Sequence, residues 1–330
     1  LRGFNAEGVA NGQSNIGPYW YDAAAPSSVT VSDEGTWTPY ADQLGASWTA
    51  ASDGSGSGVS EYQYAIGNSS GDQSVRTWTS AGTSTSVKAT GLSLTEGASY
   101  YIQVRAVDKA GYVGAASASD GITVAPAVSK IGQAWDLQNG VAFALRDKTA
   151  TASRSGEFWL EEADRSAGIR VLSATQVTPG SLVSVAGLMG LSGSQRVMQA
   201  DVVGTSGTAS GAQTPAPLFF RLQALGGRAV NAQTPGVDGA AGLYNVGLLA
   251  RCTGRISASA VDGPSGRYFY LDDGSGVTDG STAGVKVYCG AAAVPASGWV
   301  TVAGVVATEQ GTDGVRAVLI VRDASDVSAL

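Results

Sequence analysis

The sequence of 330 residues contains no histidine. This absence excludes the Ser-His-Asp and Cys-His arrangements that activate nucleophiles, zinc or copper sites built on imidazole, and the usual general base near neutral pH. Carboxylate pairs remain, so composition alone leaves glycoside hydrolysis open. Because few classes of enzyme survive this filter, we expect a protein with no enzymatic activity and no cofactor.

Charge is scarce as well, since only 14% of the residues are charged and the formal net charge is −7. An acidic chain without a stripe of Lys and Arg cannot neutralise many phosphates, so no nucleic acid is expected as a partner. No apolar run approaches the roughly 18 to 20 residues of a membrane-spanning helix, and we expect no membrane span. Low charge with abundant Gly, Ser, Thr and Ala is typical of an extracellular or cell-surface protein. The first residue, Leu1, indicates a processed form or a fragment.

Residues 26–126 contain short alternating segments separated by Gly, Ser and Asp turns roughly every 8 to 12 residues, as in an all-β sandwich. Along 99–108, apolar and more polar side chains alternate, which predicts one buried and one outer face. The predicted buried face comprises Tyr100, Ile102, Val104 and Ala106, and the outer face Tyr101, Gln103 and Arg105.

Three stretches of this region resemble strands B, C and F of a fibronectin type III domain. They are "LGASWTAASD" with Trp48, "GVSEYQYAIG" with Tyr62 and Tyr64, and "LSLTEGASYYIQVRAVDKAG". The spacing from Leu94 to Tyr100 matches the tyrosine corner of that family, in which the hydroxyl hydrogen-bonds back to the backbone. The resemblance implies a β-sandwich. Because domains of that family have no catalytic residues, it implies no catalytic residue in this region.

The rest of the chain contains an internal repeat. "GEFWLEEADRSAGIRVLS" at 156–173 aligns with "GRYFYLDDGSGVTDGSTAGVKVYC" at 266–289, and "SLVSVAGLMG" at 181–190 aligns with "GWVTVAGVVA" at 298–307. The alignment equates Leu160 with Leu271, Gly168 with Gly284, and Gly187 with Gly304. With one further strand before and one after, each copy has five strands in the order expected of an OB-fold barrel. The copies resemble OB-like modules of large secreted bacterial proteins.

The predicted fold class is therefore all-β, with a fibronectin type III/Ig-like β-sandwich followed by two tandem OB-like β-barrels. The expected organisation is an N-terminal segment at 1–25, the sandwich at 26–126, the first barrel at 127–204, a linker with a short helical turn at 205–242, and the second barrel at 243–330.

Acidic residues in the second copy raise the question of a metal loop. An EF-hand needs acids at alternating positions and a later Glu, whereas Asp272 and Asp273 are adjacent and glycines follow. The first copy has Glu161 and Glu162 at the same place without a glycine-rich loop. We therefore expect a strand end and a turn, with no metal site; a weak calcium site is the alternative. Asp108 in "VDKAG" resembles the turn acids of calcium-binding sandwiches, although a turn explains it as well.

Aromatic residues on the second strand of each copy could form a ligand platform, because OB surfaces bind strands or glycans through stacked aromatics. Alternation assigns Phe269 to the core and leaves Tyr268 and Tyr270, with Trp159 of the first copy, as candidates for a platform. Ordinary strand packing is the favoured interpretation of the same residues.

The two cysteines, Cys252 and Cys289, both lie in the second copy, where the first has Leu145 and Ser173. Two cysteines confined to one small domain favour a disulfide in an oxidising compartment. A zinc site would lack ligands without histidine.

Residues 1–25 do not share the pattern of the sandwich. They form either the end of a preceding module or a segment that adds a strand to the sheet edge of a neighbouring copy. In the second case Phe4, Tyr19, Trp20 and Tyr21 are the predicted anchors for assembly.

The favoured hypothesis is an extracellular structural protein, a subunit of a surface filament, sheath or layer whose main partner is another copy of itself. The alternative is an extracellular carbohydrate-binding module with glycans as partners, single-stranded nucleic acid being the weaker option. A third hypothesis is a fragment of a secreted hydrolase whose catalytic domain lies outside these residues.

Overall fold

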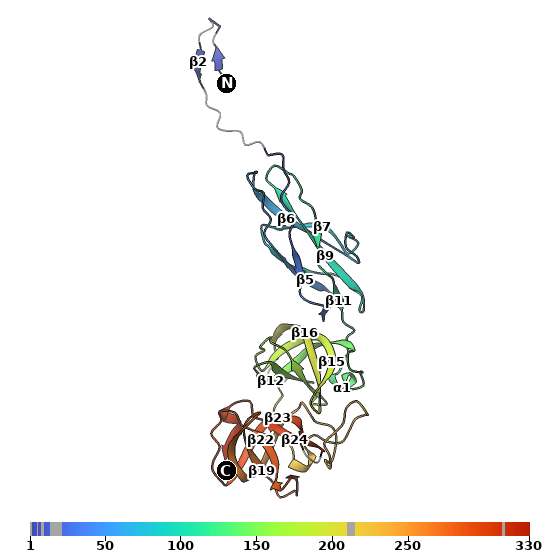
Figure 1. The fold of residues 1–330 in the computed structure, drawn as a ribbon, viewed down its shortest axis with the longest axis vertical. Coiled ribbons are helices and arrows are strands. Elements are labelled where there is room, and N and C mark those ends of the chain that lie inside the picture. Colours follow the sequence, from blue (N-terminus) through green and yellow to red (C-terminus); the bar gives the residue numbers. More distant parts are fainter. Residues whose placement is uncertain (1, 5, 8–9, 14–21, 210–214, 312–313) are drawn as a thin grey trace. The chain divides into compact units, whose positions relative to one another are not determined.

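The computed structural model describes all residues except 1, 5, 8–9, 14–21, 210–214 and 312–313 (Figure 1). The described chain is almost entirely β, so the predicted all-β class is confirmed. It divides into two compact units, residues 1–34, 42–94 and 98–122 in the first and residues 35–41, 95–97 and 123–330 in the second. No helix among the described residues is long and apolar enough to cross a membrane.

Two antiparallel sheets form a β-sandwich in the first unit. One has the strand order β9, β6, β7, with β10 also paired to β9, and the other has the order β3, β5, β8. The bounds are β3 (Val31–Asp33), β5 (Gln43–Trp48), β6 (Val59–Gly67), β7 (Arg76–Gly82), β8 (Ser86–Thr90), β9 (Ser99–Asp108) and β10 (Ser117–Ala118). Earlier in the chain, β1 (Arg2–Phe4) and β2 (Ala10–Gln13) pair as a hairpin.

The core of the sandwich contains the face predicted for β9. The side chains at most 4% exposed on this strand include Tyr100, Ile102, Val104 and Ala106. Trp48 of β5 packs against Tyr62 of β6 with ring centroids 5.8 Å apart, which joins the two sheets. The residues that carry the fibronectin resemblance are thus core residues.

Gln103 departs from the predicted alternation. It lies on the outer face of β9 yet is only 4% exposed, because its side-chain amide donates to the carbonyl oxygen of Asp72 in the connection after β6. Alternation determines the face on which a residue lies, but a loop folded over that face can still bury it.

Five strands of the second unit close into a barrel, called barrel 1. The order around it is β12, β13, β14, β16, β15, and β15 pairs back to β12; β14 and β16 run parallel, whereas the other pairs are antiparallel. The bounds are β12 (Ala142–Arg154), β13 (Glu157–Glu161), β14 (Gly168–Leu172), β15 (Ser181–Ser192) and β16 (Gln195–Thr208), with helix α1 (Ile131–Ala134) before them. Phe143, Phe158 and Leu160 fill its interior.

A second closed ring of strands, called barrel 2, has the same order. β18, β19, β22, β24 and β23 follow one another, β23 pairs back to β18, and the third and fifth strands are again parallel. The bounds are β18 (Leu249–Gly263), β19 (Gly266–Asp272), β22 (Val285–Tyr288), β23 (Trp299–Gly311) and β24 (Gly314–Ile320). Smaller elements are β17 (Leu218–Phe219), η1 (Leu222–Ala224), β20 (Thr278–Asp279), β21 (Thr282–Ala283), η2 (Ala324–Asp326) and β25 (Val327–Ala329).

The sequence repeat corresponds to this repeated topology. Leu160 and Leu271 each lie on the second strand of a barrel and are fully buried. Gly187 and Gly304 each lie on the fourth strand, where a Cβ atom would come within 2.0 Å of the carbonyl oxygen of Gln199 and within 2.8 Å of that of Ile320. At this position the fifth strand approaches so closely that only glycine fits without a shift of the backbone.

Residues 35–41, between β3 and β5, belong to the second unit together with residues 95–97 and the end of β11. β4 (Trp37–Thr38) pairs in parallel with residues 123–124 of β11 (Ile122–Val124). The N–H of Trp37 donates to Asp201 of β16 over 2.8 Å, and Arg146 of β12 donates to the carbonyl oxygen of Pro39 over 2.6 Å. Backbone and charged groups of barrel 1 therefore fix this segment.

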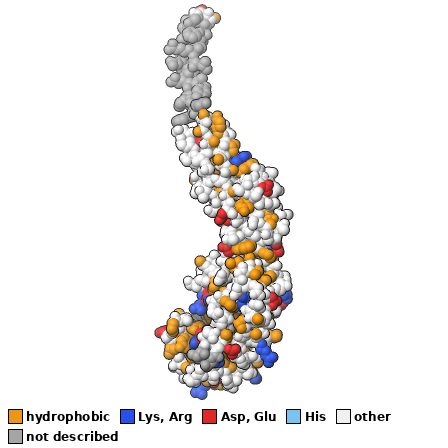
Figure 2. All heavy atoms as spheres, turned by 45° about the vertical axis from the view of Figure 1, so that its right-hand side comes forward, with side chains coloured by type: hydrophobic (Ala, Val, Ile, Leu, Met, Phe, Trp, Pro, Cys, Tyr) orange, Lys and Arg blue, Asp and Glu red, His pale blue; other side chains and the backbone are white. Residues whose placement is uncertain are grey.

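The region expected as a linker is partly folded. β17 pairs in parallel with β18, and the short helical turn lies at η1, after which Gly226 has φ +81°. The side chain of Asn245 accepts from the N–H of Gly226 and donates to the carbonyl oxygen of Ala224, at 2.8 and 2.7 Å. These bonds hold the turn against the start of barrel 2. The face shown in Figure 2 has few charged side chains, as the composition indicates.

Candidate functional sites

The residues predicted to mediate assembly fall at the start of the chain. Phe4 ends β1, which pairs with β2 through the register Phe4↔Ala10. Tyr19, Trp20 and Tyr21 lie outside the described residues. Their role in assembly stays a prediction.

The sandwich has sheet edges that could accept a strand. β7 pairs with β6 and with no other described strand, and it is the longest edge strand of the sandwich with seven residues. β3 is only three residues long, and β8 carries Lys88. Short strands and lysines protect sheet edges from pairing, so β7 is the least protected edge.

The burial of Trp159 contradicts the alternative in which it forms part of a ligand platform. The side chain is fully buried in a cluster with Ala152 of barrel 1 and with Leu249 and Val305 of barrel 2. It lies on the outer face of β13 as alternation indicates, but barrel 2 covers this face. Trp159 is therefore a contact between the barrels and cannot stack on a ligand.

Backbone contact and buried charge complete the junction between the barrels. A Cβ atom on Gly168 would lie 2.4 Å from the carbonyl oxygen of Gly247, so the backbone segments of the two barrels are in direct contact here. Glu161 is fully buried, binds the guanidinium of Arg165 at 2.9 Å, and accepts from the N–H of Leu249 at 2.5 Å. Burial raises the pKa of Glu161, although Arg165 opposes this effect.

Tyr268 and Tyr270 lie on the outer face of β19, opposite the buried Phe269 and Leu271, as alternation predicted. Both are half-buried, and their ring centroids are 5.8 Å apart in a T-shaped pair. Tyr288 of β22 lies 5.9 Å from Tyr268. With Lys286, these three tyrosines form a surface called the tyrosine face.

Lys286 lies among these rings, with its Nζ atom 5.0 Å from the centroid of Tyr268. It forms ion pairs with Glu309 and, at 3.7 Å, with Asp279. Burial would lower the pKa of Lys286, but the hydrogen bond to Glu309 outweighs burial and holds the pKa above its usual range. The ammonium group therefore stays charged at neutral pH.

The hydroxyls of the tyrosine face are oriented by acids. Tyr270 donates to Asp279 at 2.7 Å and Tyr288 donates to Glu309 at 2.6 Å. Burial, and then the hydrogen bonds to these carboxylates, raise the pKa of both tyrosines, so the phenols remain protonated. Sequence reasoning missed Tyr288, which alternation along β22 places on the same face.

A cavity of about 260 Å³ lies beside the tyrosine face. Leu222, Leu225 and Val277 contribute apolar surface to it, and Asp279, Lys286 and Arg316 contribute charge. This mixture of apolar surface with a few polar groups is typical of a small-molecule site, although ligand pockets for larger molecules start at about 300 Å³. The space suits one small polar group.

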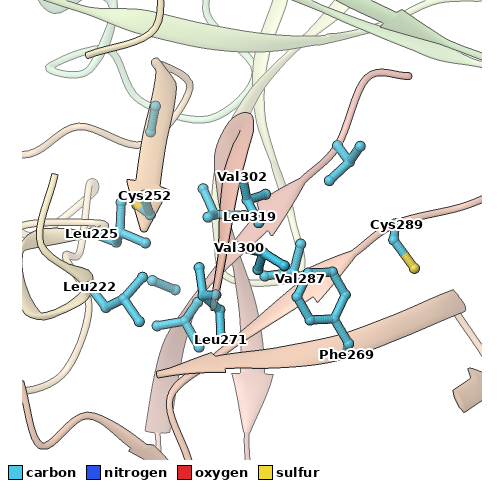
Figure 3. Packing of buried hydrophobic residues seen from close by; sticks show 14 of the residues in the cluster. Leu222, Leu225, Cys252, Phe269, Leu271, Val287, Cys289, Val300, Val302 and Leu319 are labelled. Carbon is cyan, nitrogen blue, oxygen red and sulfur yellow. The ribbon is translucent and has the colours of Figure 1, made fainter. Parts of the chain in front are cut away.

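The predicted disulfide between Cys252 and Cys289 is absent, since both are free thiols buried in the core of barrel 2. Figure 3 shows them on different sides of the core side chains. The N–H of Cys289 donates to the carbonyl oxygen of Arg267, and Arg267 pairs with Asp262 of β18. Cys289 therefore lies beside Asp262, ten residues (262 − 252) along β18 from Cys252. At about 3.3 Å per residue, the distance between the two cysteines exceeds the Cα separation of about 4.4 to 6.8 Å that a disulfide spans.

The acids of the loop after β19 act within a turn. Asp272 accepts from the N–H of Gly274, and Asp273 accepts from the N–H groups of Ser275 and Leu222, at 2.8 to 3.0 Å. These contacts are those of a strand end followed by a tight turn. Among the described residues, the acids that do lie close enough to share a cation are Asp22, Asp53 and Asp108.

Comparison with known proteins supports the sandwich. Residues 37–126 match the family model of the Rha78A-like N-terminal immunoglobulin domain. The chain contains an immunoglobulin- or fibronectin type III-like domain of the kind typical of extracellular proteins. No curated protein matches the chain.

Similar solved structures include titin kinase and its flanking domains, with 15% identity over 51% of this chain and 30% of that chain and a TM-score of 0.22. The chain thus corresponds to less than a third of that structure. The chicken CNTN1 FN1-FN3 domains share 13% identity over 57% of this chain and 68% of that chain, with a TM-score of 0.24. A third is SGBP-B of the Bacteroides ovatus mixed-linkage glucan utilization locus in complex with a mixed-linkage heptasaccharide, with 8% identity over 92% and 69% of the two chains and a TM-score of 0.17. At these scores the likenesses carry no inference about activity or partners.

Proposed function

We propose that the chain is an extracellular structural protein without enzymatic activity, a subunit of a surface filament, sheath or layer. It assembles with copies of itself through contacts between β domains and through its N-terminal segment. The junction between the barrels is the observation that carries this proposal. It joins successive modules through the buried Trp159 and the buried pair of Glu161 and Arg165. A subunit that maintains a regular spacing needs such fixed joints between its modules.

The two barrels are, in this proposal, OB-fold modules used as building blocks. Their shared strand order, with the fifth strand between the third and the fourth, supports this assignment. Two repeated modules in tandem give a subunit more than one surface for lateral contact. If one such contact is heterologous and does not close into a ring, the product is a filament.

β7 is the strand that we propose accepts the N-terminal segment of a neighbouring copy. Its residues Arg76–Gly82 include no proline, and the residues on it are half-buried or exposed. Added strands gain main-chain hydrogen bonds from such an edge, while the aromatic residues of the donor supply apolar contact. Phe4, Tyr19, Trp20 and Tyr21 would provide that contact.

Electron microscopy and sedimentation of the full chain at neutral pH test this proposal. We expect regular fibres or sheets, and we expect deletion of residues 1–21 to leave a folded monomer. Thr79→Pro in β7 should block assembly as well, whereas Thr85→Pro, in the turn before β8, is the matched control. Assembly that is unchanged by both the deletion and Thr79→Pro would rule out the strand-donation mechanism, and a uniform monomer of the full chain would rule out the filament role.

A second candidate function is carbohydrate binding at the tyrosine face. Three tyrosines around a charged lysine, with hydroxyls held by Asp279 and Glu309, offer both stacking surface and hydrogen bonds. The neighbouring cavity adds polar groups that could orient a ring substituent. The second and third strands are also the surface through which OB folds bind oligosaccharides.

Titration with a panel of soluble glycans, followed by intrinsic fluorescence and calorimetry, tests this candidate. Tyr268→Ala should weaken binding about five- to 150-fold, because a stacked aromatic ring contributes about 1 to 3 kcal/mol. Tyr112→Ala, on an exposed tyrosine of the sandwich, should leave binding unchanged. Flat titrations across the panel would exclude the tyrosine face as a glycan site.

A further inference from the structure

Three carboxylates converge at one end of the sandwich, where the loop before β6 meets the end of β9. Asp53 lies in the middle of that loop, Asp108 ends β9, and Asp22 lies in the segment that leads into the sandwich. One carboxylate oxygen of each residue lies within 4.8 Å of the others. The residues are 31 and 55 positions apart in the sequence (53 − 22 and 108 − 53), so only the fold brings them together.

Backbone N–H groups hold one oxygen of each carboxylate in place. Ser57 donates to Asp22 at 2.7 Å, Gly58 donates to Asp53 at 2.6 Å, and Tyr112 donates to Asp108 at 2.8 Å. The loop itself is tied to the turn after β9, because the backbone N–H of Lys109 donates to the carbonyl oxygen of Gly58 at 3.0 Å. The three side chains are thus positioned before any ligand arrives.

Two further oxygens of the group have no hydrogen-bond partner although they are buried. Asp108 is only 2% exposed and its Oδ2 atom has no partner, and the same is true of the Oδ1 atom of Asp53. No Lys or Arg among the described residues forms an ion pair with any of the three acids. A buried carboxylate oxygen without a donor or cation is strongly disfavoured. The ammonium group of Lys109 lies near Gly58, 3.7 Å from the position of a Cβ atom there, but forms no ion pair with the three acids.

We propose that Asp22, Asp53 and Asp108 bind a calcium ion. Carboxylate oxygens are the ligands of hard cations, and softer metals prefer the imidazoles and thiolates that this sandwich lacks. The three oxygens all lie within 4.8 Å of one another, so one cation can contact all of them. Ca²⁺ accepts several carboxylates in a flexible geometry, whereas Mg²⁺ usually keeps several waters and takes one or two carboxylates, so a set of three carboxylates favours Ca²⁺.

Calcium at this position would fasten the segment around Asp22 to the body of the sandwich. The ion would bridge Asp22 to two residues that are already fixed by β6 and β9. Asp22 directly follows Tyr21 in the sequence, and Tyr21 is one of the predicted assembly anchors. The site itself does not depend on the proposed assembly and holds for a monomer.

Calorimetric titration of the full, EDTA-treated chain with CaCl₂ tests the site, with MgCl₂ as the comparison. We expect one saturable site with a dissociation constant of about 10⁻⁴ to 10⁻³ M, the range found for calcium sites of extracellular modules. Thermal unfolding of the sandwich should shift upward by roughly 5 to 10 °C in 10 mM CaCl₂, because calcium binds only the folded state. Asp108→Asn should weaken binding at least tenfold and remove the shift.

Two variants separate loss of ligands from loss of folding. Asp22→Asn changes a residue at the start of the domain, so it should weaken binding at least tenfold while the EDTA-treated protein keeps its melting temperature. Asp120→Asn removes an exposed acid of the same domain outside the group and should change neither quantity. Absence of saturable binding up to 10 mM CaCl₂, equal binding by Asp108→Asn, or equal affinity for Mg²⁺ would overturn the calcium assignment.

Discussion

The two barrels place equivalent aromatic residues in opposite environments. The repeat equates Trp159 with Tyr270, and both lie on the outer face of the second strand. Trp159 is fully buried because barrel 2 packs over that face of barrel 1, whereas Tyr270 is half-buried and its hydroxyl binds Asp279. The same position thus serves as a joint in one copy and as accessible surface in the other.

The third strand of each barrel carries a basic residue at the equivalent position, and the surroundings of the two residues also differ. Arg170 of β14 pairs across the sheet with Trp159, and its guanidinium binds Glu157 at 2.7 Å. The equivalent Lys286 pairs with Tyr270, forms ion pairs with Glu309 and Asp279, and also lies over the ring of Tyr268. Both barrels therefore pair this cation with acids, but barrel 2 adds aromatic rings around it.

Truncation of the two aromatic residues should have the largest and most unequal effect. Trp159→Ala removes a fully buried ring and should lower the free energy of unfolding by about 3 to 5 kcal/mol. Tyr270→Ala removes a half-buried ring and should cost about 1 kcal/mol. Urea denaturation followed by circular dichroism measures both. Equal losses would show that barrel 2 does not cover Trp159 in solution.

The glycines of the fourth strands offer a smaller test of the same comparison. A Cβ atom on Gly187 would come within 2.0 Å of a backbone oxygen, against 2.8 Å for Gly304. We expect Gly187→Ala to destabilise by about 3 kcal/mol and Gly304→Ala by about 1 kcal/mol, since overpacking costs scale with the shift required. Thermal melts of both variants would check the order, and the reverse order would contradict the spacing of the strands in the two barrels.

The alternation of side chains predicted much of this structure, and its failures share a cause. It assigned Phe269 to the core and Tyr270 to the outside correctly, and it placed Trp159 on the right face of its strand. It could not show that another barrel covers that face, because the covering residues Leu249 and Val305 lie about 90 and 146 positions later in the chain. Gln103 was misjudged for the same reason, since a loop covers it.

The candidate sites were less predictable than the fold. The fold depends on local periodicity, whereas Asp22, Asp53 and Asp108 belong to three segments that are distant in the sequence and carry no shared pattern. The cysteines illustrate a related limit. Confinement to one domain suggested a disulfide, but the register of the strands separates the two thiols, and register cannot be read from composition or spacing.

The buried Glu161 at the junction predicts a dependence of stability on pH that no residue of the tyrosine face should share. Burial raises the pKa of Glu161 above its ordinary value of 4.5, so the folded chain holds this proton more tightly than the unfolded chain does. The contribution of Glu161 to stability is most favourable below pH 4.5 and falls as the pH rises through its folded pKa.

Glu161→Gln removes this titration, so the stability of the native chain relative to this variant should fall between pH 4.5 and 7. Urea denaturation of both proteins across this range measures the difference. A relative stability that rises with pH would mean that the ion pair with Arg165 outweighs burial and lowers the pKa instead.

The smallest expected effect concerns the cysteines, which only barrel 2 contains. Burial raises the pKa of the Cys252 thiol to about 12 and also raises the pKa of Cys289, so both are protonated and unreactive in the folded state. Dithiothreitol should leave the melting temperature unchanged, and two thiols should react with Ellman's reagent only after denaturation. If reduction instead lowered stability by about 3 to 4 kcal/mol, as expected for a disulfide closing a loop of this length, the strands of barrel 2 would need a different register. Barrel 1 closes with the same strand order and no cysteine, which is why covalent closure is not expected to be needed in barrel 2.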